Sequence, residues 1–345
     1  LADADRARLE FRAGFGYTSE QYIMLRNTAF HLDNPGSRGV FVVSFREQKP
    51  FLINDYNEIE HTLSPRSLRF ARRMGAQAFI CCPIICDGES IGIMTVDNLR
   101  SKRPLVHSDM SLLMGIAPII GISLRNAELI ESKTETFHAI LAALVASIEA
   151  RDPLTAGHSE KVTEYSVGIC EEMGLDREYR EMIPVAALLH DYGKIGVPDA
   201  ILKKPGRLTE SEYRAVKEHA GKTEQILERI RFEGIYKGVP RIAGSHHEKI
   251  DGSGYPRGLE GSAIPLGARI IAVADFFEAV TSKRHYREPM PLSVAKQMLK
   301  ERKGTHFDPD VVDAFLRYCR RPNAGLPEDR KAAVVPFPVQ GISRA

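Results

Sequence analysis

The chain of 345 residues contains, past its midpoint, the stretch Val185-Ala-Ala-Leu-Leu-His190-Asp191-Tyr-Gly-Lys194. Five successive apolar residues indicate a buried helix, and His190 and Asp191 stand at its end. A buried, ionised carboxylate needs a partner charge or a metal ion. Imidazole and carboxylate together suit Fe, Mn or Zn better than Ca or Mg. The stretch therefore predicts a metal centre at the end of a core helix.

The segments that follow contain further residues of the same kind. His219 lies on the apolar side of a helix that Thr209 and Glu212 open with a capping box. Asp275 interrupts the apolar run of another helix, predicted over residues 268–281. A lone buried histidine is more often a satisfied core residue than a ligand. Several such residues in one helical region favour a shared metal site.

The pair His190-Asp191 has a specific chemical use. Neighbouring side chains diverge by about 100° on a helix, yet both can reach one ion at the helix end. Asp191 has two oxygens and could also bridge to a second ion. Paired metals about 3.5–4 Å apart activate water and clamp the oxygens of an in-line phosphoryl displacement. The residues thus point to a metal-dependent phosphohydrolase.

The N-terminal part of the chain alternates in the manner of strands. We expect strands over residues 1–16 and over Val40 to Ser44. The segments Ala78 to Cys86 and Ile91 to Val96 flank an Asp87-Gly88 turn, which predicts a β-hairpin. This part is therefore expected to form a domain of mixed α and β structure.

From Asp109 the apolar period becomes helical, and the helix is expected to end before Pro153. Its apolar stripe consists of Ile130, Phe137, Leu141, Leu144 and Ile148. A stripe of this kind on a connecting helix forms a dimer seam or packs on a neighbouring surface. We expect a parallel homodimer through this helix.

The composition is that of a globular protein, with 43% hydrophobic and 27% charged residues. The net charge of +2 gives no general reason to expect nucleic-acid binding. No apolar run long enough for a membrane span and no signal peptide is evident, so a cytoplasmic location is expected. The chain begins with Leu1, and the natural protein is expected to extend upstream. No CxxC pair occurs among the five cysteines, which suit a reducing compartment: Cys81, Cys82, Cys86, Cys170 and Cys319.

The C-terminal half contains three segments in order: His190-Asp-Tyr-Gly-Lys194, Pro198-Asp-Ala-Ile-Leu202 and His246-His-Glu-Lys-Ile-Asp-Gly-Ser-Gly-Tyr-Pro256. Together they resemble the HD-GYP family of cyclic-di-GMP phosphodiesterases. The likeness continues through Gly258-Leu-Glu-Gly261, Ile264-Pro265, Ala268-Arg-Ile-Ile271, Val273-Ala-Asp275, Arg284-His-Tyr-Arg287 and Phe307-Asp-Pro309. A bare His-Asp pair is weak evidence for this family, whereas the ordered series of motifs over residues 145–320 is very specific for it.

The resemblance implies roles for residues at the matching positions. The implied metal ligands are His158, His190, Asp191, His219, His246, His247 and Asp275, with Asp191 bridging two divalent ions, Fe or Mn. His158 is the ligand whose role stays open, since it could instead contact a bound water. Lys194 is implied to face the scissile phosphate. The implied catalytic residues are therefore Lys194 and the bridging ligand Asp191. The implied substrate contacts are Lys194, Arg284, Arg287, Gly254 and Tyr255, although a solvated helix end would also explain the arginines.

Two further expectations come from the same resemblance. Some family members hold a third metal with a glutamate where this chain has Leu154, so we expect two ions rather than three. Neither Glu149, which is distant along the chain, nor Glu160, which is expected to face solvent, is a good substitute. The loop Gly254-Tyr-Pro256 could also meet a diguanylate cyclase-type partner. The final product, pGpG or GMP, does not follow from the sequence.

The N-terminal half resembles a GAF domain in Phe79-Ile-Cys-Cys-Pro-Ile-Ile85, Gly88-Glu-Ser-Ile-Gly92 and Val96-Asp-Asn98. The expected architecture is an α+β GAF domain over residues 1–124, a connecting helix over 125–144 and an all-α HD-GYP domain over 145–320. A disordered tail is expected over 321–345. The predicted function is hydrolysis of cyclic-di-GMP, regulated by an unknown GAF ligand. The alternatives are a non-catalytic cyclic-dinucleotide receptor and an HD-type phosphohydrolase acting on another nucleotide.

Overall fold

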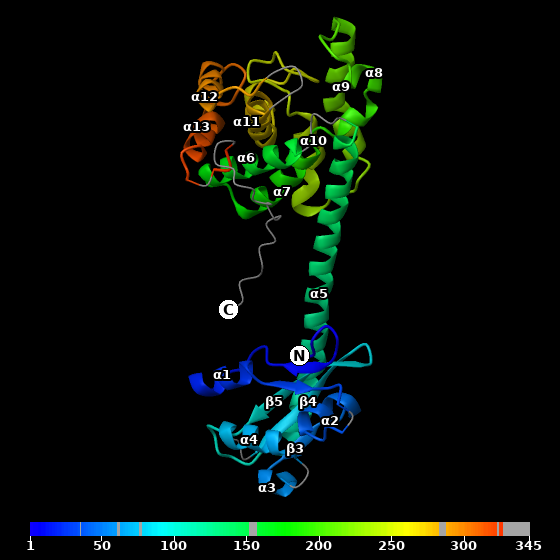
Figure 1. Cartoon of the computed structure of the whole chain (residues 1–345), viewed down its shortest axis with the longest axis vertical. Helices are drawn as coiled ribbons and strands as arrows, with labels where there is room; N and C mark the ends of the chain where they lie inside the picture. The colour runs from blue at the N-terminus through cyan, green and yellow to red at the C-terminus, as the bar shows by residue number, and fades with distance from the viewer. Residues whose placement is uncertain are drawn as a thin grey trace. The chain divides into compact units, whose positions relative to one another are not determined.

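The computed structural model describes residues 1–34, 36–60, 63–75, 78–151, 157–282, 288–322 and 324–326. It divides into two compact units, Leu1–Glu135 and Thr136–Ala345. The strands belong to the first unit, and the second is built from helices (Figure 1). The predicted α+β and all-α parts are therefore both present. Arg284, Arg287, Leu154 and most of the expected tail lie outside the described residues.

The first unit contains a two-stranded and a three-stranded antiparallel sheet. Strand β1 (Arg8–Glu10) pairs with β2 (Ala29–His31), and β4 (Phe79–Cys86) lies between β3 (Phe51–Ile53) and β5 (Glu89–Asp97). The predicted hairpin β4–β5 is confirmed. Asp87 and Gly88 both have positive φ, 51° and 79°, as a tight hairpin turn requires.

Two strand predictions for this unit are wrong. Residues 40–47 form helix α2 (Val40–Glu47), which buries Val42 and Phe45. These two residues are three positions apart and share a helical face, whereas a short apolar run by itself does not distinguish a strand from a buried helix. Within residues 1–16 the described strand is only β1. The other short helices of the unit are α1 (Ser19–Arg26), α3 (Tyr56–Ile59) and α4 (Pro65–Met74).

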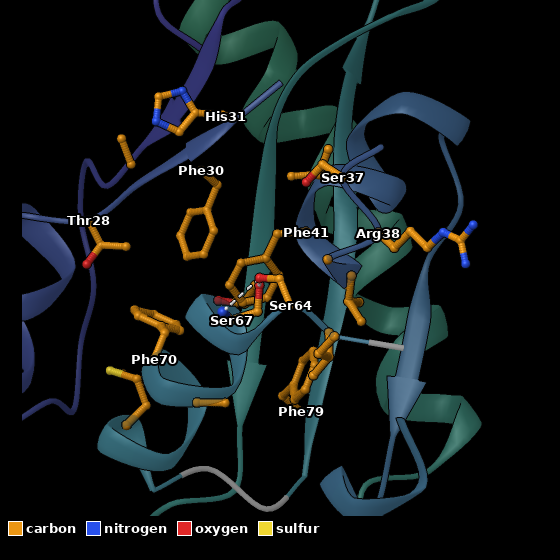
Figure 2. Close-up of a pocket in the computed structure, with 18 of the residues that line it drawn as sticks. Thr28, Phe30, His31, Ser37, Arg38, Phe41, Ser64, Ser67, Phe70 and Phe79 are labelled. Atoms are coloured by element: carbon orange, nitrogen blue, oxygen red, sulfur yellow. Dashed lines mark hydrogen bonds between the residues drawn. The ribbon is translucent and has the colours of Figure 1, made fainter. Parts of the chain in front are cut away.

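A cavity of about 460 Å³ lies in the first unit between α2, α4 and the strands. Phe30, Phe41, Phe70 and Phe79 line it, and Phe41 meets each of the other three rings edge to face at centroid distances of 5.1–6.5 Å. Ser64 and Ser67, whose hydroxyl oxygens lie 3.0 Å apart, also line the cavity (Figure 2). The volume is in the range of small-molecule sites.

Helix α5 (His107–Glu149) runs without interruption through the predicted domain boundary and connecting helix. It ends before Pro153, as expected. The predicted stripe, however, is not an open dimer face. Leu141 and Ile148 are 3% and 6% exposed in the core of the second unit, where Phe137 and Leu144 also pack. From Phe137 onward the stripe is covered by helices of the second unit.

Ile130, the first residue of the predicted stripe, is exposed, and so are further apolar residues of α5: Leu112, Ile116, Ile119, Ile122, Leu129 and Ile140. Among the described residues, α5 is the one helix long and apolar enough to cross a membrane. The expectation that no segment reaches this length is thereby corrected. Core helices of soluble proteins meet the same criterion, so the property is weak evidence for a span.

The described helices that follow α5 build the second unit. They are α6 (His158–Glu172), α7 (Arg177–Leu189), α8 (Asp199–Leu202), α9 (Glu210–Leu227), α10 (Val239–Gly244), α11 (Leu266–Thr281), α12 (Leu292–Glu301) and α13 (Pro309–Tyr318). The predicted capping box at Thr209 and Glu212 is present at the start of α9. Tyr165, Phe277 and Phe315 form the centre of the core, with ring centroids 4.7–5.8 Å apart. The apolar run of α7 is buried in this core and ends at His190.

Candidate metal centre

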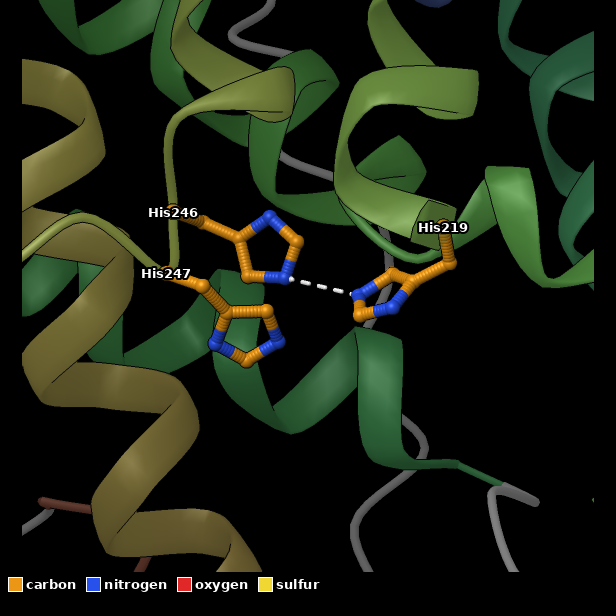
Figure 3. Close-up of side chains that lie close together, drawn as sticks. All are labelled: His219, His246 and His247. Atoms are coloured by element: carbon orange, nitrogen blue, oxygen red, sulfur yellow. Dashed lines mark hydrogen bonds between the residues drawn. The ribbon is translucent and has the colours of Figure 1, made fainter. Parts of the chain in front are cut away.

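The structure brings together all seven predicted ligands, from three helices and two inter-helix segments. His158 begins α6, His190 and Asp191 follow α7, His219 lies in α9, His246 and His247 follow α10, and Asp275 lies in α11. Three groups of potential ligand atoms each lie within 4.8 Å of one another: His158, His190 and Asp275; His190, Asp191 and His246; and His219, His246 and His247. Figure 3 shows the last group. The groups share His190 and His246, so they form one continuous cluster.

Asp191 lies between the two ends of this cluster. Its Oδ1 is 3.3 Å from Nε2 of His219, and its Oδ2 is 3.7 Å from Nε2 of His158. Asp275 is on the His158 side, with Oδ1 3.3 Å from Nε2 of that residue. The two carboxylate oxygens of Asp191 thus face different histidines, which is the geometry a bridging ligand needs.

Three histidines are oriented by their own backbone. The Nδ1 atoms of His190, His219 and His246 each lie 2.6 Å from the carbonyl oxygen three residues earlier, in Ala187, Val216 and Ala243. A carbonyl oxygen only accepts, so Nδ1 carries the proton and Nε2 carries the lone pair. Each Nε2 points into the cluster. This donor set fits transition-metal ions, because neutral imidazoles and carboxylates are ligands that such ions prefer.

The electrostatics of the metal-free cluster separate its histidines. Burial lowers the pKa of His247 to about 4 and holds the pKa values of His190 and His246 below their ordinary value. Burial also opposes the charged form of His158, but Asp275 and Glu278 raise its pKa to about 9. The neutral histidines can bind metal directly, whereas His158 must first release a proton.

The carboxylates are held ionised. Burial by itself would raise the pKa of Asp191, but Lys194 and His190 keep this pKa well below its usual range. Burial would likewise raise the pKa of Asp275, and His158 holds it below the usual range. Lys194 Nζ lies 2.6 Å from Oδ2 of Asp191, and its side chain is 16% exposed. Lys194 therefore stands at the margin of the cluster, between the carboxylate and solvent.

The turn that carries Asp191 packs tightly on α9. A Cβ on Gly193 would lie 2.0 Å from the carbonyl oxygen of His219, so only glycine fits there. Gly193 N donates to Oγ1 of Thr223, which itself donates to the carbonyl of His190. Thr223 is fully buried, and it fastens the 190–194 turn to the helix that carries His219.

A buried glutamate holds the loop after His247. Glu248 is 3% exposed and accepts from the backbone N–H groups of Arg257 and Leu259. In the loop held by Glu248, the centroid of the Tyr255 ring lies 4.8 Å from the centroid of the His247 ring. Gly254 is required, because a Cβ there would lie 2.4 Å from the backbone nitrogen of Lys249. Gly254 and Tyr255, predicted substrate contacts, thus lie beside the cluster.

Three buried residues that support the cluster were not predicted from the sequence: Thr223, Glu248 and Glu278. Glu248 and Glu278 each follow a predicted ligand, by one and three positions. The signal available in the sequence was an acidic residue within three positions of a predicted ligand. Glu149, although distant along the chain, accepts a hydrogen bond from the N–H of Gly157, directly before His158. Glu160 is exposed, as expected.

Comparison with known proteins agrees with both parts of the architecture. The HD domain family matches residues 143–311, and the GAF domain family matches residues 1–124. A protein of Thermotoga maritima named cyclic di-GMP phosphodiesterase is 35% identical over 289 residues, which are 82% of this chain and 76% of that protein.

A Vibrio cholerae protein named 3'3'-cGAMP-specific phosphodiesterase 3 is 46% identical over 178 residues, 52% of this chain and 38% of that protein. The chain thus spans less than half of the length of this relative. A solved structure of a cyclic GMP-AMP specific phosphodiesterase from V. cholerae is 39% identical, covers 52% of this chain and 40% of that one, and has a TM-score of 0.35. With the signature Gly254-Tyr255-Pro256 beside a His/Asp cluster, and with a relative aligned over most of both chains, this chain belongs to the HD-GYP family of HD-domain proteins and carries an N-terminal GAF domain.

Proposed function

We propose that the chain is a metal-dependent phosphodiesterase that hydrolyses cyclic-di-GMP. The observation that carries the proposal is the convergence of five histidines and two aspartates with Lys194 at their margin. The names of the relatives from T. maritima and V. cholerae support a cyclic dinucleotide as the substrate. Two divalent ions, Fe or Mn, when bound there, would activate water and neutralise phosphate charge.

The residues of the chain have separate tasks in this proposal. Asp191, with one oxygen toward His219 and the other toward His158, is the bridging ligand. The Lys194 ammonium faces the scissile phosphate and offsets the negative charge that develops during attack. Tyr255 and Gly254 line the substrate side of the cluster, and Arg284 and Arg287 bind substrate phosphate. Linear pGpG is the first product, and GMP follows if both ester bonds are cleaved.

The test is turnover by protein purified and loaded anaerobically with Fe²⁺ or Mn²⁺. Cyclic-di-GMP, 3'3'-cGAMP and a mixture of dNTPs are offered separately, and the products are separated by chromatography. Hydrolysis of cyclic-di-GMP supports the proposal. Turnover of dNTPs alone identifies another HD-type phosphohydrolase, and tight binding without turnover identifies a receptor. Retention of Lys194 and of all seven ligand positions favours catalysis over the receptor.

A second candidate substrate is 3'3'-cGAMP. The observation that favours it is the 46% identity to the V. cholerae protein named for this substrate, which is higher than the 35% identity to the T. maritima protein. That higher identity extends over only 52% of the chain, so the longer alignment to the T. maritima protein puts cyclic-di-GMP first. The ratio of kcat/KM values for the two dinucleotides decides between them.

The remaining parts of the proposal concern regulation. A small molecule in the Phe-lined cavity of the GAF unit would regulate the metal centre, which the size of the cavity supports. The protein acts as a cytoplasmic homodimer through α5, using its exposed apolar positions rather than the buried stripe. The signature loop Gly254-Tyr-Pro256, in which Pro256 is exposed, would meet a diguanylate cyclase-type partner.

A further inference from the structure

One imidazole of the cluster is held on both sides by carboxylates of a single helix. Asp275 and Glu278 lie three residues apart on α11 and therefore share a helical face. Asp275 Oδ1 lies 3.3 Å from Nε2 of His158, and Glu278 Oε2 lies 2.5 Å from Nδ1 of the same ring. The carboxylate can only accept, so Nδ1 donates to Glu278 and Nε2 faces the cluster.

This arrangement distinguishes His158 from three other histidines of the cluster. His190, His219 and His246 each donate Nδ1 to a backbone carbonyl within their own segment, whose position follows from helix geometry. His158 is the first residue of α6, and its partner comes from a helix 120 residues further along the chain. Its ring orientation therefore depends on the side chain of Glu278.

Glu278 is itself fixed. It is 3% exposed, and its second oxygen, Oε1, accepts from the hydroxyl of Ser282 at 2.5 Å. A buried carboxylate is costly to desolvate and contributes little to stability compared with an apolar side chain of similar size. A charged hydrogen-bond partner on the outer nitrogen of an imidazole has another effect: it fixes the tautomer and makes the inner nitrogen a stronger metal donor.

We infer that Glu278 is a positioning residue that aims Nε2 of His158 at a metal ion shared with Asp275. The inference rests on the proposed function only in so far as the cluster binds metal. It assigns His158 to metal coordination rather than to a water contact. Removing Glu278 weakens metal binding by about 10–100-fold, the range found for carboxylates that orient ligating histidines.

The test measures binding of Mn²⁺ to the metal-free full chain by competition with a chromogenic chelator, without any dinucleotide. The variants are Glu278→Leu, Glu278→Gln, His158→Ala and the double variant His158→Ala/Glu278→Leu. Glu278→Leu is expected to lower the affinity for the Mn²⁺ ion shared by His158 and Asp275 by about 10–100-fold. Glu278→Gln, which keeps a hydrogen-bond acceptor, should lower it less. In the His158→Ala background, Glu278→Leu should add less than about twofold, since the two residues act as one unit.

Asp308→Asn provides a matched control. Asp308 is also a buried carboxylate, but it caps α13 and pairs with Arg269. This variant is expected to lower the melting temperature and leave Mn²⁺ affinity unchanged. Ser282→Ala, which removes the hydrogen bond from Ser282 to Oε1 of Glu278, should weaken Mn²⁺ binding slightly and provides the test if Glu278→Leu does not fold.

Unchanged affinity in both Glu278→Gln and Ser282→Ala overturns the inference. Equal losses from Glu278→Leu with and without His158 also overturn it, because Glu278 would then act elsewhere. Because no substrate is present, a wrong assignment of the dinucleotide does not alter these results. Conversely, turnover of cyclic-di-GMP by protein in which Glu278 has no effect on metal would overturn the inference and leave the proposed function intact.

Discussion

Lys194 and His219 contact opposite oxygens of Asp191: Lys194 Nζ lies 2.6 Å from Oδ2, and His219 Nε2 lies 3.3 Å from Oδ1. One carboxylate thereby connects the α9 side of the cluster to the residue at its solvent margin. Asp191 thus links the metal site to Lys194, the group proposed to face the phosphate. Substitution of Asp191 tests metal binding, and substitution of Lys194 tests the phosphate contact.

Asp191→Ala is expected to lower metal content and reduce turnover to background together, because it removes both oxygens of the bridge. Metal analysis and a cyclic-di-GMP assay on the same preparation provide the measurement. Asp313→Asn is the control, since Asp313 pairs with Lys303 at the surface. Full activity in Asp191→Ala, or in chelator-stripped wild type, would show that the bridge is not used.

Lys194→Ala is expected to lower kcat by about 10²–10³-fold with a smaller change in KM, as for loss of one group that stabilises developing charge. Metal content should be retained, because Lys194 is not a ligand. Arg284→Ala should instead mainly raise KM. Lys203→Ala, which removes an exposed lysine paired with Asp199, serves as the control. A change in KM alone from Lys194→Ala contradicts the assigned roles.

The metal-free protein is expected to lose stability as the pH rises from about 6.5 to about 9. The pKa of His158 is raised to about 9 in the fold, against about 6.5 in the unfolded chain. The charged form thus stabilises the fold, fully below about pH 6.5, and this contribution disappears as the pH passes through about 9. Its upper limit is about 3 kcal/mol.

Urea unfolding of metal-free wild type and His158→Gln across this pH range measures the effect. The variant should show a flatter profile, and the wild type loaded with Mn²⁺ should also do so, because metal displaces the proton. Equal pH dependence in wild type and variant would assign the effect to another group.

Exposed and buried positions on α5 should respond differently to substitution. Ile119→Ser with Ile122→Ser is expected to shift a dimer to monomer and leave the core of the second unit intact, since both residues lie in the first unit and are more than half exposed. Leu141→Asp should destabilise the second unit by more than about 4 kcal/mol, because it buries an unpaired charge in the core. Light scattering and thermal unfolding separate the two effects. A dimer that survives the serine variant uses another surface.

Elemental analysis of fully loaded protein is expected to give two metals per chain. A third ion would need another anionic ligand, and Leu154 offers none. Leu154→Glu should move the count towards three. Three tightly held ions in the wild type would refute this expectation, and Glu149, which lies against Gly157, would be the first residue to substitute.

Local sequence determined those features whose physical cause is local. The hairpin β4–β5 follows from the Asp87-Gly88 turn, and α9 follows from its capping box. The cluster was also predictable, because a carboxylate beside a histidine at the end of a buried helix must be balanced by a cation or a metal. The resemblance of the ordered motifs over residues 145–320 to the HD-GYP family then identified the other predicted ligands.

Tertiary structure decided what depends on partners distant in the chain. Residues 40–47 became a helix, not a strand, because Val42 and Phe45 could be buried together on one helical face. The stripe around Leu141 looked like a dimer seam, but it is covered by its own second unit. The contact between Glu278 and His158 joins residues 120 positions apart. No local pattern encodes such a contact, because it exists only once α6 and α11 pack against each other.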